Sequence, residues 1–353
     1  LREFSMAEAE IFFDPRDKTH PNFHGVKNQK LYLFDNEKEM KISLEKAVKT
    51  NVINNQALAY YMYLTQEFLI AAGIDTKKFR FRKHADDELA HYATECWDAE
   101  LFSERFGWVE CVGIADRSAY DLNSHIERSN TDMYALRKYN KQKTVEIKKI
   151  VPNMDVIGPL FRGKADKIKT ILENTKIKDE KKISVDLDGE TIEIPKKCYK
   201  IVEVKEKITG EKFVPHVIEP SYGIDRILYC ILEHNYSETE KKGEEYRLLK
   251  LKTKIAPIKV GVFPLISEGN LVKFAKEIDK DLRDNGILTY YDDSGTIGRR
   301  YARMDEVGTP FCITVDHETL ENKTVTIRDR DTAKQERKKI EDLIRHIKDK
   351  ISC

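Results

Sequence analysis

The sequence predicts an α+β protein in which a sheet-rich region, interrupted by an insertion, precedes a compact α/β domain. Short segments of period-2 alternation occur at residues 1–13, 79–82 and 108–112. After residue 255, strand-like apolar segments alternate with amphipathic helical segments over roughly 100 residues. That order is typical of a compact α/β domain with a mixed sheet.

The first region begins with a predicted strand, residues 1–13, which ends at Asp14-Pro15. A helix is expected over residues 41–72, and a second helix through His84, Glu88 and His91 to Trp97. A strand from Trp108 to Val112 is expected to end at Gly113.

Residues 125–214 are rich in lysine and contain a hairpin pattern, residues 183–194, that turns at Asp188-Gly189. We interpret this segment as an insertion, because the strand leading to Glu219 resumes after it. A solvated face explains its lysines best, with a nucleic-acid contact as the alternative.

The C-terminal domain has four predicted strands and three predicted helices, one of which begins at Gly298 and carries Arg299, Arg300 and Arg303. One helix runs from Leu271 to Gly286, and the last carries apolar residues from Ile340 to Ile351. The strands are expected at residues 258–265, 287–291, 310–315 and 324–328.

Composition describes a globular protein with a highly charged surface, since 35% of its 353 residues are charged. The 62 Lys and Arg nearly balance the 61 Asp and Glu, so a polyanion would have to meet local patches. No apolar run has the length of a membrane span, and no signal-peptide pattern opens the chain. The six cysteines lack CxxC spacing, which favours reduced core residues of a cytoplasmic protein.

The segment from Val217 to Leu232 is the most informative. It predicts a buried strand, a turn at Pro220 to Gly223, and a buried, rigid helix whose first turn carries Asp225 and Arg226. An arginine fixed beside carboxylate and hydroxyl groups can hold an anion together with a small polar substrate. An ordinary strand-to-helix connection with an exposed arginine is the alternative.

This segment resembles motif 3 of the class II aminoacyl-tRNA synthetases, which ends in an acidic residue and an arginine. Glu219 and Ser221 stand where most of the class has glycines, and this substitution resembles glycyl-tRNA synthetase of the dimeric type of eukaryotes and archaea. Residues 2–8 resemble the second strand of motif 2. Residues 107–117 resemble the central active-site strand, and residues 292–303 the anticodon-binding domain.

The resemblance implies a glycine-tRNA ligase that converts glycine and ATP to glycyl-adenylate and transfers glycine to the 3′ end of tRNA(Gly). Its partners would be tRNA(Gly), glycine, ATP, Mg²⁺ and a second subunit, bound through a segment missing from this chain. It also implies an antiparallel-sheet catalytic domain at residues 1–250, with the insertion at about 125–214, and an anticodon-binding domain at residues 255–353. Motif 1 and the motif 2 arginine would precede Leu1, so we expect no complete active site here.

The resemblance also assigns residues to ligands. Arg226 and Glu110 would be catalytic, and Glu110 would bind Mg²⁺. ATP would contact Leu1, Glu110, Cys111 and Arg226. Glycine would contact Glu8, Arg117, Glu219, Pro220 and Ser221. Transfer RNA would contact Arg299, Arg300, Arg303 and Arg328.

The chemistry of these residue types agrees. Glycine offers only an ammonium and a carboxylate: Glu8, Glu219 and Ser221 suit the first, and Arg117 suits the second through a bidentate fork. Side chains at positions 219 and 221 would also exclude alanine by occupying space.

Three alternatives stay open. His84, Glu88 and His91 share one face of the expected helix, as metal ligands do, although polar residues at the edge of the active site are favoured. A non-catalytic RNA-binding accessory protein descended from such a synthetase is the second. In the third, Arg80 or Arg82 replaces the missing motif 2 arginine.

Overall fold

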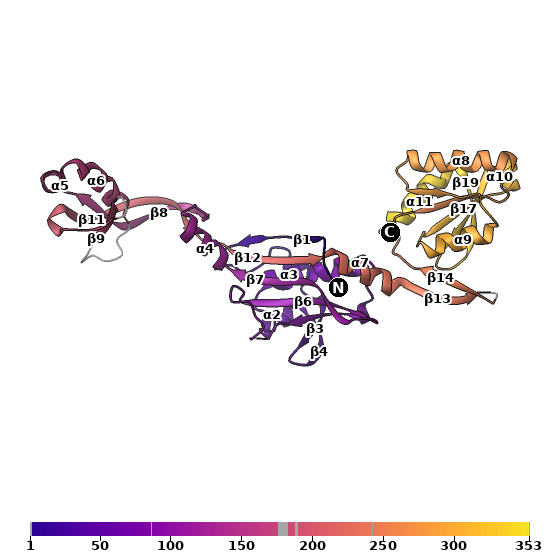
Figure 1. Ribbon diagram of the computed structural model, residues 1–353, viewed down its shortest axis with the longest axis horizontal. Helices are drawn as coiled ribbons and strands as arrows, with labels where there is room; N and C mark the ends of the chain where they lie inside the picture. Colours follow the sequence, from indigo (N-terminus) through magenta and orange to yellow (C-terminus); the bar gives the residue numbers. More distant parts are fainter. Residues whose placement is uncertain (1, 86, 176–182, 188–189, 242, 353) are drawn as a thin grey trace. The chain divides into compact units, whose positions relative to one another are not determined.

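The computed structural model describes residues 2–85, 87–175, 183–187, 190–241 and 243–352 (Figure 1). Contacts divide the chain into two compact units, one of residues 1–129 with 215–353 and the other of residues 130–214. The predicted borders at residues 250 and 255 stay predictions.

The first unit is built on an eight-stranded sheet with the order β1-β12-β7-β6-β5-β3-β4, in which β2 also pairs with β12. Its neighbouring strands are antiparallel except for β3 with β5. This sheet confirms the α+β class. Its strands are β1 (Met6–Glu8), β2 (Ile11–Phe13), β3 (Lys30–Asp35), β4 (Lys38–Ser43), β5 (Phe79–Lys83), β6 (Glu95–Ser103), β7 (Gly107–Ser118) and β12 (His216–Gly223).

One face of this sheet packs on helices and the other carries polar side chains. In β5, Phe79 and Phe81 are buried in the helix-covered core, whereas Arg80 and Arg82 alternate with them and lie on the opposite face. The helices of this part are α1 (Phe23–Val26), α2 (Leu44–Lys49), α3 (Gln56–Ala71), α4 (Tyr120–Ser129) and α7 (Ile224–Asn235).

Two predicted helices are wrong in part or in whole. The helix expected at 41–72 is broken between α2 and α3, where Asn51 has a positive φ and the Asn55 side chain caps the amide of Leu58. The helix expected from His84 to Trp97 does not form: β6 begins at Glu95. The alternation of Trp97, Ala99 and Leu101 with Asp98 and Glu100 is the signal of a strand, and the predicted helix overlooked it.

Helix α7 buries one stripe only, because the sheet covers a single side of it. Ile227, Cys230 and Ile231 face the core, while Leu228 and Leu232 are exposed. The prediction of a helix buried all round is therefore wrong for this chain.

The second unit pairs two long antiparallel strands, β8 (Ala135–Pro152) and β11 (Tyr199–Phe213). The predicted hairpin is present as β9 (Ile183–Leu187) and β10 (Glu190–Ile194), with its turn at Asp188-Gly189 outside the described residues. Helices α5 (Met154–Phe161) and α6 (Ala165–Asn174) share a small apolar core with these strands.

The C-terminal part of the first unit contains a five-stranded mixed sheet with the order β16-β15-β17-β18-β19, which confirms the predicted α/β domain. Helices α8 and α11 share one apolar core with the sheet, and α9 packs in a separate small core with Phe263 and Cys312. In Figure 1, α8 and α9 accordingly lie on opposite sides of the strands.

The elements of this part are a hairpin of β13 (Tyr236–Lys241) and β14 (Glu244–Leu249), strands β15 (Val260–Pro264), β16 (Thr289–Tyr291), β17 (Phe311–Val315), β18 (Thr324–Asp329) and β19 (Gln335–Lys339), and helices α8 (Gly269–Asp284), α9 (Ile297–Glu306), α10 (His317–Asn322) and α11 (Ile340–Ser352). No helix among the described residues is long and apolar enough to cross a membrane.

Candidate active site

The polar face of the large sheet carries a cavity of about 220 Å³. Antiparallel pairing of β12 with β7 sets Glu219 opposite Ala115 and Ser221 opposite Gly113, which brings their side chains to one face. Gly113 and Ala115 leave room above the strands. The cavity is lined by His84, Glu88, Ala90, Tyr92, Ala93, Cys96, Asp98, Glu110, Gly113, Ala115, Arg117, Glu219 and Ser221.

Arg117 is held on the cavity wall by two carboxylates. Its Nη1 donates to both oxygens of Glu219 at 2.8 Å, and its Nη2 donates to Asp121 at 2.7 Å. Its guanidinium also lies 4.4 Å from the centre of the Tyr92 ring. Burial works to lower the pKa of Arg117, but these acids outweigh it and raise the pKa. The cavity therefore contains a fixed, permanent cation.

Ser221 connects this wall to the edge strand β1. Its hydroxyl donates to Glu8 at 3.0 Å, in the register that pairs the two residues. Glu219 and Ser221 thus line the cavity, and Glu8 contacts Ser221 without lining it. Pro220 points the other way: it is buried and does not line the cavity, and only its carbonyl oxygen makes a polar contact, with the amide of Ala9.

Arg226 lies at the start of α7, next to the backbone of β7. Its Nη1 donates to the carbonyl oxygen of Glu110 at 2.8 Å, and its Nε is buried with no hydrogen-bond partner among the described residues. The Arg226 amide donates to Glu3 at 3.1 Å. A Cβ on Gly223 would lie 2.0 Å from the Glu3 carboxylate, so glycine is required for that approach.

Asp225 does not pair with Arg226. Its carboxylate accepts from the amides of Phe4 and Ser5 at 2.8 and 2.7 Å, and these two bonds lower its pKa. Glu3 and Asp225 therefore tie the N-terminal segment to α7. The sequence analysis did not predict that Asp225 would hold the N-terminal segment in this way.

Glu110 is exposed beside the cavity. Neighbouring atoms nevertheless remove part of the water around its carboxyl group, and this, with the charge of Asp98, raises its pKa. Cys111 is buried, its thiol donates to the Val109 carbonyl, and its pKa is raised through its contact with Cys230 and by burial. Only the backbone of Cys111 is thus available to a ligand. Leu1 lies outside the described residues.

The three residues His84, Glu88 and His91 do not form one face. His91 is exposed and contacts the rings of Tyr92 and Tyr120, away from the other two. Glu88 instead accepts two bonds from Arg82, at 2.7 and 3.0 Å. Without the expected helix, the spacing that suggested a metal site has no structural counterpart.

Sequence reasoning missed the network beside the cavity. Arg82 also binds Glu100 at 3.0 Å and Asp98 at 2.7 Å. Asp98 in turn lies 2.9 Å from Nε2 of His84, and Asp98 first, then Cys96, raises the pKa of this histidine to about 10. The alternation of β5 was the available signal, because it sets Arg82 and His84 on the polar face.

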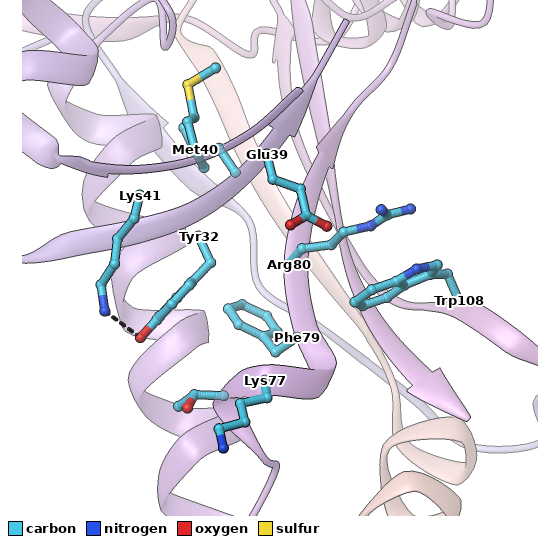
Figure 2. A pocket seen from close by; sticks show the side chains of 10 residues that line it. Tyr32, Glu39, Met40, Lys41, Lys77, Phe79, Arg80 and Trp108 are labelled. Carbon is cyan, nitrogen blue, oxygen red and sulfur yellow. Dashed lines mark hydrogen bonds between the residues drawn. The ribbon is translucent and has the colours of Figure 1, made fainter. Parts of the chain in front are cut away.

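A larger hollow of about 630 Å³ lies in the same unit, lined by residues of β3, β4 and β5 together with Trp108 (Figure 2). Arg80 is fully engaged there: its guanidinium is 3.9 Å from the ring of Phe34 and 4.1 Å from that of Trp108, and its Nε donates to Glu100. Apart from Arg80, the alternative to the motif 2 arginine, none of the predicted ligand-binding residues lines this hollow.

The arginines of the C-terminal domain differ from expectation. Arg300 is 1% exposed and donates to the backbone oxygens of Pro264, Asp293 and Gly295. Arg328 is 5% exposed and makes a two-pronged ion pair with Asp305, both bonds at 2.8 Å.

A role in contacting nucleic acid does not fit the burial of Arg300 and Arg328. Both guanidinium groups instead hold loops and strands of the domain together through their hydrogen bonds. Arg299 is exposed at the start of α9, and Arg303 is partly exposed and paired with Asp292. Arg299 and Arg303 alone keep the geometry of a surface site.

Comparison with known proteins gives consistent similarities. Residues 259–350 match the family described as "Anticodon binding domain". Over 99% of the chain, the sequence is 45% identical to a protein named "Glycine--tRNA ligase" from Methanocaldococcus jannaschii. Similar proteins of the same name in Archaeoglobus fulgidus and Pyrococcus horikoshii are 47% and 44% identical, over 97% and 99% of the chain. The chain spans 64%, 60% and 63% of the length of these three relatives.

Proposed function

The chain is homologous to archaeal glycine--tRNA ligases over nearly its whole length, and on that premise we propose that the protein activates glycine with ATP and passes it to the 3′ end of tRNA(Gly). The main support for this proposal is the cavity on the polar face of the large sheet, over β7 and β12. There, a fixed guanidinium, carboxylates and one hydroxyl lie around a space bounded by Gly113 and Ala115.

Glycine recognition would use the two walls of the cavity. Glu8, Glu219 and Ser221 supply acceptors for the ammonium group, and Arg117 supplies a fork for the carboxylate. Arg117 already holds Glu219 and Asp121, so the substrate carboxylate would share or displace one of these acids. If the substrate carboxylate displaces Glu219, the free energy of glycine binding depends on the substrate ammonium group pairing with the released Glu219 carboxylate.

ATP would bind between Arg226 and the backbone of Glu110 and Cys111. The Nε of Arg226 makes no hydrogen bond among the described residues and only a long ion pair with Glu3, at 3.6 Å, so an anionic ligand could compete for this arginine. The carboxylate of Glu110 would be the ligand for a divalent cation, and bound Mg²⁺ would neutralise phosphate charge. The protein's own part is to position the two reactants and stabilise charge.

Contact with tRNA would involve the C-terminal domain, through Arg299 and Arg303 at the start of α9. The homology of residues 259–350 to an anticodon-binding domain supports this assignment. Arg303 would exchange its contact with Asp292 for RNA, whereas Arg299 is directly accessible.

A homodimer is also proposed. Exposed apolar side chains on α3 and α7 support a contact surface, because exposed apolar patches often mark protein–protein interfaces. They are Leu64, Phe68, Leu228 and Leu232.

The alternative is a non-catalytic RNA-binding protein derived from a synthetase. The charged cavity argues against it, since a protein without glycine activation has no use for Arg117, Glu219 and Ser221 in one pocket. Glycine-dependent exchange of pyrophosphate into ATP separates the two. The chain would be assayed alone and after extension to the length of its relatives, with glycine, alanine and serine in parallel. Exchange with glycine only, in the extended protein, is expected; equal rates with alanine would exclude the glycine assignment.

A further inference from the structure

We propose that His84, Cys96 and Asp98 form a binding site for one divalent ion of the zinc class, in the wall of the cavity. Among the described residues, these three are the one group of three His, Cys, Asp or Glu side chains whose ligand atoms all lie within 4.8 Å of one another.

The distances fit a shared ion after a small adjustment. Ligands bound tetrahedrally at about 2.1 Å (nitrogen) and 2.3 Å (sulfur) lie about 3.6 Å apart. Closing a separation of at most 4.8 Å to that value requires about 1 Å of movement. Cys96 and His84 are partly exposed, so rotation of their side chains can supply it.

The donor set selects the kind of ion. A thiolate, an imidazole and a carboxylate together suit zinc, or cobalt in its place, and not Mg²⁺, which prefers oxygen ligands and water. Three protein ligands also leave one tetrahedral position open. All three residues line the cavity, so that position would face the space beside Glu219 and Ser221.

His84 supplies a second observation. Its Nε2 lies 2.9 Å from Asp98, while its Nδ1 is buried without a hydrogen-bond partner among the described residues. Asp98 and then Cys96 raise the pKa of this histidine, so an ion bound to the ring would have to displace a proton that these two groups stabilise.

Charge in the cavity permits a cation. Arg82 contacts Asp98, but Glu88 and Glu100 also bind this arginine and offset its charge. Glu110 and Glu219 add two carboxylates to the cavity wall, against the single guanidinium of Arg117. The wall therefore has more acid than base even with Arg82 counted.

Metal content of the purified full chain tests the site. The protein would be incubated with ZnCl2, dialysed against metal-free buffer and analysed by mass spectrometry, and a CoCl2-loaded sample would be read by absorption. We expect about one ion per chain and a sulfur-to-cobalt charge-transfer band. Cys96→Ser should abolish the band, and His84→Asn should weaken zinc retention at least about tenfold.

Matched controls are His317→Asn, on the exposed start of α10, and Cys198→Ser, in the other unit. Both should retain the ion and the band. Circular dichroism would show that each variant is folded. Zinc should also slow alkylation of Cys96 by iodoacetamide. Retention well below one ion per chain, or equal retention in Cys96→Ser and the parent, would overturn the proposal, and neither result bears on glycine activation.

Discussion

Arginines of the large sheet and arginines of the C-terminal domain have the same chemistry but opposite placements. Arg117 and Arg226 lie on or beside an open sheet face, where Arg117 pairs with carboxylates and Arg226 contacts the Glu110 carbonyl oxygen and the Glu3 carboxylate. Arg300 and Arg328 lie inside their domain and fill their hydrogen bonds with backbone oxygens or a buried acid. The first pair is available to ligands, and the second stabilises a fold.

The difference shows what helical spacing does not reveal. Arg299, Arg300 and Arg303 sit close together on α9, yet they have three different environments: exposed, buried and paired at the surface. Helix α9 packs on the sheet through the face that carries Arg300. Arg299 is its neighbour in sequence but lies on the exposed side of the helix.

The largest expected effect is from Arg328→Ala. It leaves the buried Asp305 carboxylate with the Tyr246 hydroxyl but without its cation, a change that costs about 3–5 kcal/mol. Chemical unfolding of the full chain, followed by a probe in the C-terminal domain, measures it. Arg299→Ala is the control and should be as stable as the parent. Equal stability of both variants would show that the buried Arg328 does not stabilise the domain more than the exposed Arg299.

Arg226→Ala is expected to reduce glycine-dependent pyrophosphate exchange by more than a hundredfold, equal to about 3 kcal/mol, because a positioned charge is lost from the transition state. The assay uses the protein extended to the length of its relatives. Arg299→Ala should leave exchange unchanged and weaken only tRNA charging. If the two variants lose exchange equally, the separation of roles between the two regions is wrong.

Ser221→Gly tests the cavity itself. Removing the side chain opens space next to Gly113 and breaks the bond to Glu8. The preference for glycine over alanine should fall about 10- to 200-fold, the range for one methyl group in a pocket. The ratio of exchange rates with the two amino acids measures it. An unchanged ratio would mean that exclusion of alanine depends on another wall.

The smallest effect concerns Asp225, whose pKa is lowered in the folded protein. Its contribution is therefore present at neutral pH and is lost as pH falls below about 4, the ordinary pKa of an aspartate. Asp225→Asn should lower Tm at pH 7, with the two proteins converging near pH 3. A constant difference at both pH values would show that shape, and not charge, holds residues 4 and 5 to α7.

The sequence alone determined the local features. Alternation located β5 and most of β7. Apolar segments located four of the five strands of the C-terminal sheet but missed β19, and the order of helices and strands predicted the mixed sheet. The resemblance of three separate segments to class II synthetases also named Glu8, Arg117, Glu219 and Ser221, and the structure joins them in pairs, Arg117 with Glu219 and Ser221 with Glu8. These signals depend on periodicity and side-chain chemistry, both of which are local.

Only the tertiary structure decided burial and partners. Strand β6 is buried on both faces, so its polar residues Asp98 and Glu100 lie in ion pairs with arginines of β5 and not in solvent. Arg328 pairs with Asp305 because β18 and α9 meet in the core. Pro220 points away from the cavity because its position in β12 places it on the other face of the sheet. His84 meets Cys96 and Asp98 across adjacent strands, a grouping that depends on strand pairing and not on spacing along the chain.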